Sequence, residues 1–205
     1  TIYKNFDSLV PDAPDLIEKF LEMETDPSCQ RNAYLTLIQM DQKRAINYLR
    51  NKATSVLSFG DVQQLAIIEL VYSYCVDSYD KNSYLKYLYE LLEASSPSVR
   101  FAAANTLLSL SDSSTALEYT SKCYTNLILK ESDNNVKLVV LDRLSFIHSL
   151  KKNDWTLHDV ALDLLSVLNV GASDSIVDLE VARRVLALVI NLLTAERVET
   201  VVNFI

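Results

Sequence analysis

The sequence predicts an all-α protein assembled from packed pairs of helices. Its 205 residues include only 2 Gly and 4 Pro, fewer turn-forming residues than a sheet protein of this size would need. Apolar residues recur at i, i+3 and i+4 over long stretches, a spacing that places them on one face of a helix. The turns that begin several of these stretches also recur at a nearly constant interval, which indicates a structural repeat.

The first half of the chain predicts a succession of helices separated by turns. Proline at positions 11, 14 and 27 and the Phe59-Gly60 pair interrupt the helical pattern, because proline ends the helix before it and favours the first turn of the next. We expect residues 1–6 to be the last turns of a helix that begins before the chain does. The helices predicted after it span 15–23, 29–40, 41–56, 61–76 and 83–94.

In the second half, the stretch 131–147 gives the clearest helical signal. Ser132, Asp133 and Asn134 can cap its start, because their side-chain oxygens accept the unpaired backbone N–H groups of a first turn. Arg143 projects from the expected apolar face, so we expect a carboxylate or carbonyl partner from a neighbouring helix. The expected apolar face consists of residues 136, 139, 140, 144, 147 and 150. The other helices predicted here span 98–110, 114–130, 155–168, 175–193 and 195–205.

The turns that begin alternate helices repeat along the chain. Asp26-Pro27, Gly60-Asp61, Ser96-Pro97 and Asp133-Asn134 follow one another at intervals of about 35, 36 and 37 residues. A period of this length holding two helices is typical of an α-solenoid of HEAT-like or armadillo-like repeats, which winds into a right-handed superhelix. We expect residues 1–205 to form a single solenoid fragment of about five to six repeats, with accessible faces suited to protein contacts.

The composition excludes several functional classes. A formal net charge of −8 disfavours nucleic acid as the main partner, because phosphate contacts need a basic excess. Cys29, Cys75 and Cys123 lack metal-ligand spacing, so we expect small buried hydrophobes. His148 and His158 are the only histidines, and no phosphate loop or hydrolase motif accompanies them. We therefore expect no catalytic residues, no metal and no cofactor, and no apolar run is long enough to span a membrane.

Two features are candidates for a partner surface. Six of the 11 tyrosines lie between residues 72 and 89, where they can either bind a protein or pack between helices. We expect Tyr84 and Tyr87 to be partly exposed, and an exposed fraction below about a tenth for both would exclude them. The acidic run that includes Glu22 and Asp26 can attract a basic partner segment, or it can be an ordinary solvated face.

Several strings resemble the adaptin-like trunk of the coatomer beta family (beta-COP), the beta subunits of the COPI vesicle coat. They are SDNNVKLVVLDRL at 132–144, IYKNF at 2–6, VPDAPDLI at 10–17, CQRNAY at 29–34 and FGDVQQL at 59–65. The similarity fades after residue 151 and partly returns at 178–181. Together these strings are specific to the family, and they cover only a middle part of its trunk.

The resemblance implies a non-enzymatic scaffold of the coat that acts in Golgi-to-ER and intra-Golgi transport, in the cytoplasm and peripherally on Golgi membranes. The partners it implies are the delta subunit, the gamma–zeta pair, an Arf-family GTPase in its GTP form, and sorting-signal peptides. Two alternatives remain open: another adaptor large chain or transport-receptor solenoid, and a HEAT-like DNA-binding enzyme. The acidic charge argues against the enzyme.

Overall fold

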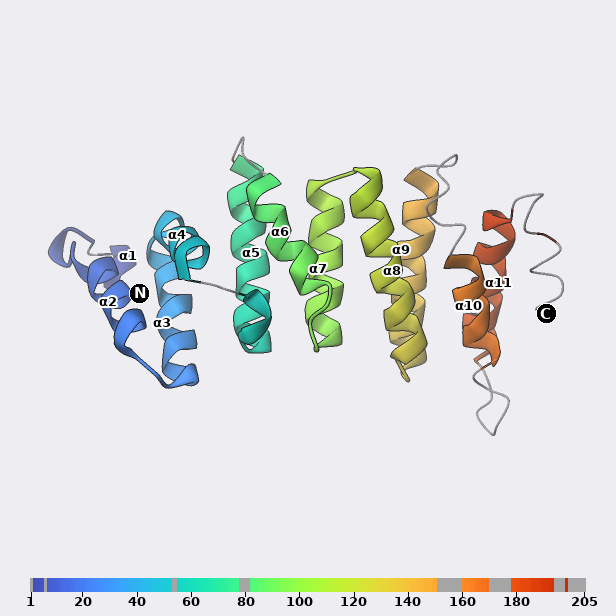
Figure 1. Cartoon of the computed structure of the whole chain (residues 1–205), viewed down its shortest axis with the longest axis horizontal. Coiled ribbons are helices and arrows are strands. Elements are labelled where there is room, and N and C mark those ends of the chain that lie inside the picture. The colour runs from blue at the N-terminus through green and yellow to red at the C-terminus, as the bar shows by residue number, and fades with distance from the viewer. Residues whose placement is uncertain are drawn as a thin grey trace. The chain divides into compact units, whose positions relative to one another are not determined.

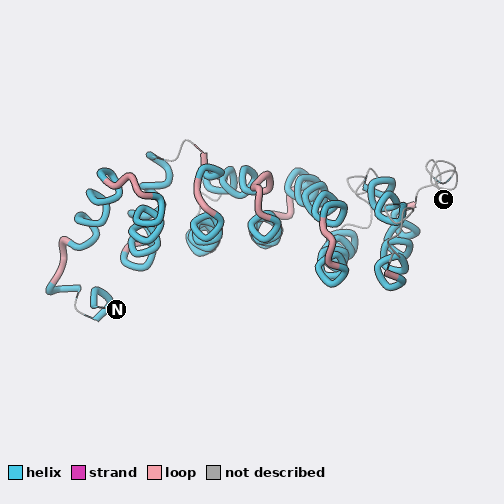
Figure 2. Tube along the Cα trace, turned by 90° about the horizontal axis from the view of Figure 1, so that it is seen from below, coloured by secondary structure: helices cyan, strands magenta, loops and turns pink. Residues whose placement is uncertain are grey.

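The computed structural model describes residues 2–5, 7–52, 55–77, 82–150, 160–169, 178–193 and 198. Across these residues every regular element is a helix (Figure 2), so the all-α prediction is confirmed. The chain divides into two compact units, Thr1–Thr106 (unit 1) and Leu107–Ile205 (unit 2). The division falls within α7 (Pro97–Leu110), and each unit is described by itself.

Unit 1 is a series of short antiparallel helices (Figure 1). α3 packs against α2, α4 and α5, and α5 also packs against α4 and α6. Seen end-on, α3 and α5 lie in one layer and α4 and α6 lie in the other (Figure 2), which is the predicted arrangement of helical pairs. The elements are α1 (Ile2–Asn5), the 3-10 turn η1 (Asp7–Leu9), α2 (Ala13–Met23), α3 (Pro27–Met40), α4 (Gln42–Lys52), the 3-10 turn η2 (Val56–Ser58), α5 (Asp61–Asp77) and α6 (Asn82–Leu91).

The connection from α4 to α5 differs from the sequence prediction. The helix expected over 41–56 ends at Lys52, and Val56–Ser58 forms a separate 3-10 turn. Glu90 of α6 explains this turn, because its Oε1 accepts the backbone N–H of Val56 at 3.0 Å and the hydroxyl of Ser55. Gln64 holds the other side, since its amide donates to the carbonyls of residues 56, 57 and 59. Side chains distant in sequence therefore fix this connection.

The core of unit 1 combines aliphatic side chains with a buried tyrosine. Tyr34 of α3 is fully enclosed, and its hydroxyl donates to the carbonyl of Ala45 in α4 at 3.3 Å. At the surface, Arg44 of α4 pairs with Asp15 and Glu18 of α2, the second at 3.3 Å. Both contacts join neighbouring helices. The largest buried aliphatic residues here are Leu37, Ile46, Leu49, Ile67, Leu70, Leu88 and Leu91.

Unit 2 is centred on α8. α8 (Ser114–Lys130) packs against α9 (Asn134–Leu150) and α10 (Val160–Asn169), and α11 (Leu179–Leu192) packs against both α9 and α10. Two buried hydroxyls of α8 are satisfied within the helix, Ser121 by the carbonyl of Leu117 and Thr125 by that of Ser121. The residues buried on α8 are Ala116, Leu117, Thr120, Ser121, Cys123, Tyr124, Thr125, Leu127 and Ile128.

The start of α9 confirms the predicted cap, but its buried face is rotated. Asp133 accepts the N–H of Asn135 at 2.7 Å and so satisfies part of the first turn. Residues 140, 141, 144 and 147 are buried, whereas Val136 and Val139 are exposed. Arg143 is exposed as well, so the expectation that it sits within a covered apolar face was wrong. A charge in contact with water needs no partner from a neighbouring helix.

The predictions about the cysteines, the last helices and the solenoid have different outcomes. Cys75 and Cys123 are buried as expected, but Cys29 is exposed because it lies in the first turn of α3. The helices predicted over 155–168 and 175–193 are present as α10 and α11, while 151–159, 170–177 and most of 195–205 lie outside the described residues. The right-handed superhelix and the single solenoid over 1–205 stay predictions.

Candidate protein-binding surface

The tyrosines proposed from the sequence as a contact surface are buried. Tyr84 and Tyr87 of α6 are only 7% and 5% exposed, so the expectation of partial exposure was wrong. Together with Leu88 and Leu91 they recur at i, i+3, i+4 and i+7, the spacing of a single helix face, and that face is buried within unit 1. The ring of Tyr84 meets that of Tyr74 edge-on, with centroids 5.0 Å apart.

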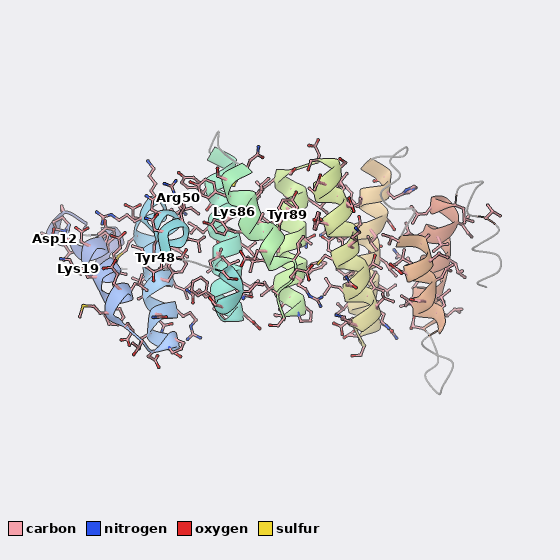
Figure 3. The ribbon with its side chains drawn as sticks, viewed as in Figure 1. Asp12, Lys19, Tyr48, Arg50, Lys86 and Tyr89 are labelled. Atoms are coloured by element: carbon pink, nitrogen blue, oxygen red, sulfur yellow. The ribbon has the colours of Figure 1, made fainter. Side chains whose placement is uncertain are left out.

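Electrostatics agree with a packing role for these phenols. Burial raises the pKa of Tyr84, and a hydrogen bond to Tyr74 raises it further, while Arg50 acts in the opposite direction. Burial is also the main cause of the raised pKa of Tyr87. Two exposed cations lie near these phenols, Arg50 on α4 and Lys86 on α6 (Figure 3). The ammonium of Lys86 lies 4.9 Å from the centroid of the Tyr87 ring and covers it.

The acidic candidates lie on the surface, as an interaction role requires. Glu22 and Asp26 are both exposed. Asp26 also has a structural role, because its carboxylate accepts the N–H of Cys29 at 2.8 Å and caps α3. This hydrogen bond is the main cause of the lowered pKa of Asp26. The proposal that Glu22 and Asp26 contact a basic partner segment stays a prediction.

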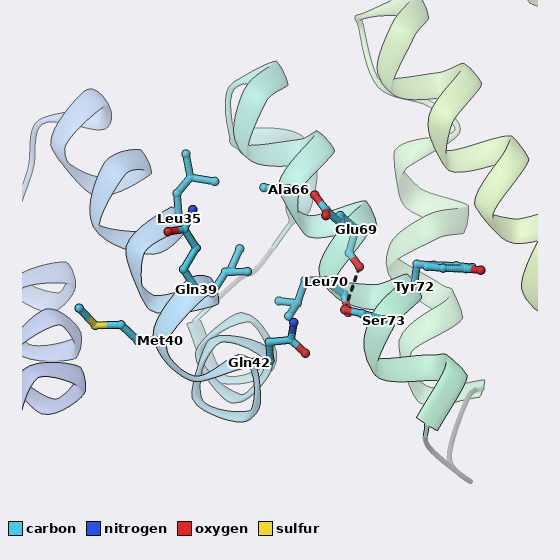
Figure 4. A pocket seen from close by; sticks show the side chains of 10 residues that line it. Leu35, Gln39, Met40, Gln42, Ala66, Glu69, Leu70, Tyr72 and Ser73 are labelled. Carbon is cyan, nitrogen blue, oxygen red and sulfur yellow. Dashed lines mark hydrogen bonds between the residues drawn. The ribbon is translucent and has the colours of Figure 1, made fainter. Parts of the chain in front are cut away.

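A groove between α3 and α5 is a second candidate, and the sequence reasoning missed it. It has a volume of about 550 Å³ and combines apolar side chains with the amides of Gln39 and Gln42 (Figure 4). Such a mixture suits an extended peptide or a partner helix, whose backbone the amides can hydrogen-bond. The groove is lined by Leu35, Ile38, Gln39, Met40, Gln42, Ala66, Glu69, Leu70, Tyr72 and Ser73.

The face of α5 beside this groove carries exposed apolar residues. Val62, Leu65, Tyr72 and Val76 recur at i, i+3, i+10 and i+14, and Tyr72 and Val76 are 45% and 55% exposed. Glu69 lies among them, and its backbone carbonyl accepts the hydroxyl of Ser73 at 3.1 Å (Figure 4). Apolar residues on both the buried and the exposed face of one helix are the sequence signal that could have indicated this surface.

The described residues offer little for catalysis. No group of three or more His, Cys, Asp or Glu side chains converges as a metal site within the part of the chain that the structure describes. His148 lies on α9, and His158 falls outside the described residues. Over the same described part, no helix is both long and apolar enough to cross a membrane.

Comparison with known proteins identifies the family. The family described as Adaptin N terminal region matches residues 1–205. The chain belongs to this family. It is also similar to "Coatomer subunit beta" of Rattus norvegicus, with 44% identity over 203 residues, which is 98% of this chain and 21% of that protein. The protein of the same name from Drosophila melanogaster is 43% identical over 199 residues, covering 97% of this chain and 20% of the relative.

The similarity extends to a distant lineage. "Coatomer subunit beta" of Dictyostelium discoideum is 37% identical over 205 residues, which is 100% of this chain and 22% of that protein. The chain therefore spans about a fifth of the length of the curated relatives it matches. The family explains the helical repeats and the scarcity of chemical motifs.

Proposed function

We propose that this chain is a structural segment of a coatomer beta subunit, and that it acts as a scaffold in the COPI coat during Golgi-to-ER and intra-Golgi vesicle transport. The observation that carries the proposal is 44% identity to coatomer subunit beta over 98% of the chain. A scaffold role requires faces for other proteins. The groove between α3 and α5 and the exposed apolar face of α5 supply such faces in unit 1.

The proposed role is non-enzymatic and needs no cofactor. The partners that follow from it are the delta subunit and the gamma–zeta pair, an Arf-family GTPase in its GTP form, and possible cargo in the form of sorting-signal peptides. The chain would then be cytoplasmic and would reach Golgi membranes and COPI vesicles peripherally, through the assembled coat. Of the sequence candidates, Glu22 and Asp26 stay available for these contacts because they are exposed.

A binding experiment with purified partners tests the proposal. The 205-residue chain, immobilised through an affinity tag, is incubated with the delta subunit, the gamma–zeta pair, GTP-loaded or GDP-loaded Arf, and sorting-signal peptides. We expect capture of at least one coat subunit, and any Arf capture should depend on GTP. If the chain retains none of these partners, a scaffold role for this segment is rejected.

A second candidate is a large chain of another adaptor complex. The matched family is described only as the adaptin N-terminal region, which favours adaptor chains in general. The same pull-down, repeated with the small and medium subunits of an adaptor complex, distinguishes the two, because each large chain should retain its own partners. A DNA-binding enzyme is disfavoured by the formal net charge of −8, and DNA binding at moderate salt would overturn that exclusion.

A further inference from the structure

The exposed face of α5 carries a regular stripe of residues. It consists of Val62, Leu65, Glu69, Tyr72 and Val76, which follow one another at intervals of three and four residues. This 3.5-residue spacing is that of a seam along which one helix packs against another. All five side chains are exposed, the four apolar ones by between 38% and 55%. These five residues, called the α5 stripe below, extend along the helix for about 21 Å.

The α5 stripe borders the groove between α3 and α5. Glu69 and Tyr72 line that groove, together with the exposed side-chain amides of Gln39 and Gln42 (Figure 4). A helix lying on the stripe can therefore place side chains from one of its flanks into the groove, where the amides can hydrogen-bond them. An apolar strip beside a polar rim is the usual composition of a protein interface.

The charges on this surface select the chemistry of the partner. Glu69 lies at the centre of the stripe, and its carboxylate forms no ion pair within the part of the chain that the structure describes. Of the described residues that line the groove, Glu69 alone is charged. The sequence of α5 contains acidic residues but neither Lys nor Arg. A cation on the partner would gain an attraction that no other group of this helix supplies, and an anionic lipid surface would be repelled.

A second copy of this chain is poorly suited to cover the stripe. Glu69 lies midway between Val62 and Val76, so two α5 stripes packed antiparallel about a two-fold axis would bring their Glu69 carboxylates face to face. Parallel pairing in register would align the same two carboxylates. Because like charges at the centre of a helix seam oppose association, the stripe is suited to a different chain.

A matching stripe on α9 of unit 2 provides an internal comparison. It consists of Val136, Val139, Arg143 and Phe146, which have the same spacing and are also exposed. Each residue lies 74 positions after its counterpart in the α5 stripe, which is two structural repeats further along the chain. Arg143 corresponds to Glu69 and has the opposite charge. A helix that carries a central cation should therefore distinguish two surfaces of similar shape and hydrophobicity.

We propose that the α5 stripe binds an amphipathic helix of a partner protein whose apolar face carries a Lys or Arg near its centre. The cation of the partner pairs with Glu69, and its apolar side chains pack against the other four residues of the stripe. The inference deepens the proposed scaffold role, on which it rests for the existence of a partner, by naming the chemistry that the partner must present.

A titration followed by NMR tests the surface on the whole 205-residue chain. The probe is a stapled helix of about 15 residues, enough to span the stripe, with leucine at the four outer positions of a matching stripe and lysine at its centre. We expect this lysine probe to shift the backbone amides of Glu69 and Tyr72 saturably. The amides of Arg143 and Phe146 in α9 should respond only at higher probe concentrations, because Arg143 repels the lysine.

Two further probes separate charge from helical shape. A stapled probe with glutamate in place of the central lysine should bind α5 about fivefold more weakly, because an attraction at the surface is replaced by a repulsion of similar size. An unstapled lysine probe with proline in its middle cannot form the helix, so it should bind more weakly than either stapled probe.

Variants assign the binding to named residues. Glu69→Lys should reverse the preference between the lysine and glutamate probes, and Tyr72→Ser should weaken the binding of both because apolar contact is lost. Glu93→Lys makes the same change of charge at an exposed residue outside the stripe and should leave the preference unchanged. All three substituted side chains are exposed, and the spectrum of unit 2 serves as the folding control for each variant.

The proposal is overturned by any of five results. These are an absence of saturable shifts in α5, equal binding of the lysine probe to α9, equal affinity of α5 for the glutamate probe, undiminished binding of the proline probe, and a preference that Glu69→Lys does not change. The pull-down of coat subunits fails separately. A chain that retains a coat subunit but not the lysine probe keeps the scaffold role and loses this surface, whereas the reverse result rejects the scaffold role alone.

Discussion

The two units use polar contacts in different ways. In unit 1, polar side chains join segments that are far apart in sequence: Glu90 holds the turn at Val56, Tyr34 reaches Ala45, and Arg44 reaches α2. In unit 2, the buried hydroxyls of Ser121 and Thr125 donate to carbonyls of their own helix, α8. The long-range polar contact there is the ion pair of Arg184 on α11 with Asp142 on α9.

This difference shows which interactions fix the folded conformation of each unit. The connections of unit 1 are irregular, and directional hydrogen bonds are needed to fix a backbone that forms no helix. In unit 2, α8 and α11 each pack against both α9 and α10, so shape and apolar burial do most of that work. We therefore expect unit 1 to be more sensitive to the loss of single polar groups, and both units to be sensitive to cavities.

The largest expected effect is a cavity in either core. Leu88→Ala in unit 1 and Leu144→Ala in unit 2 each remove a fully buried side chain, and each should lower the free energy of unfolding by about 2–5 kcal/mol. Hydrogen exchange should show lost protection mainly in the unit that carries the substitution, because repeats are stabilised by their nearest neighbours. Equal losses in both units would instead show that residues 1–205 unfold as one.

The next largest effect should come from a polar contact between distant segments rather than from one within a helix. Glu90→Ala leaves the N–H of the buried Val56 without an acceptor, so we expect a loss of about 1–3 kcal/mol in denaturant unfolding. Ser121→Ala in α8 should cost no more than about 0.5 kcal/mol, because its hydroxyl only adds a second bond to a helical carbonyl. Glu90→Gln keeps an acceptor and is the matched control. A larger loss for Ser121→Ala than for Glu90→Ala would contradict the comparison.

Removing or adding a cap at a helix start should change the stability by a smaller amount. Asp178 accepts the N–H groups of Glu180 and Val181 at the start of α11, so Asp178→Ala should destabilise the chain by about 1 kcal/mol. Asp178→Asn retains a capping oxygen and should cost less. In unit 1, Gly60→Ser introduces a cap and should stabilise the chain by about 0.3 kcal/mol. Thermal unfolding measures both, and a stabilising Asp178→Ala would show that the cap has no such role.

The smallest effect concerns pH. Hydrogen bonds from Arg183 and Arg184 lower the pKa of Glu180 from 4.5 to about 2. Because the folded-state pKa is depressed, the contribution of Glu180 is complete above its ordinary pKa and is lost as the pH falls toward about 2. A carbon-detected titration of the Glu180 carboxyl checks the value. Arg183→Gln should raise this pKa, and an unchanged titration of Glu180 would exclude Arg183 as a cause of the lowered value.

Local signals made much of the fold predictable. Pro27 and Asp26 mark the start of α3, Asp133 caps α9, and the range 114–130 predicted for α8 agrees with the structure. Each of these depends on neighbours within one helical turn, which a sequence displays directly. The all-α repeat follows from the same signals, because their spacing is nearly constant along the chain.

Contacts between distant segments were not predictable in this way. Tyr84 and Tyr87 were expected to be partly exposed but are buried. Helical periodicity alone does not reveal which face a neighbouring helix covers. The turn at Val56 depends on Glu90, 34 residues away, and no local pattern indicates that bond. The groove between α3 and α5 exists only when the two helices lie side by side, so no local sequence pattern indicates it.

The exposed position of Cys29 makes unit 1 easy to label with a fluorescent dye. Cys75 and Cys123 are buried, so a maleimide dye added to the folded chain would attach selectively at Cys29, in the first turn of α3. Interaction with Asp26 raises the pKa of this thiol, so the coupling should be run in mildly alkaline buffer, where more thiolate is present. A fluorophore placed there would report on binding or unfolding near the start of α3 without any engineered cysteine.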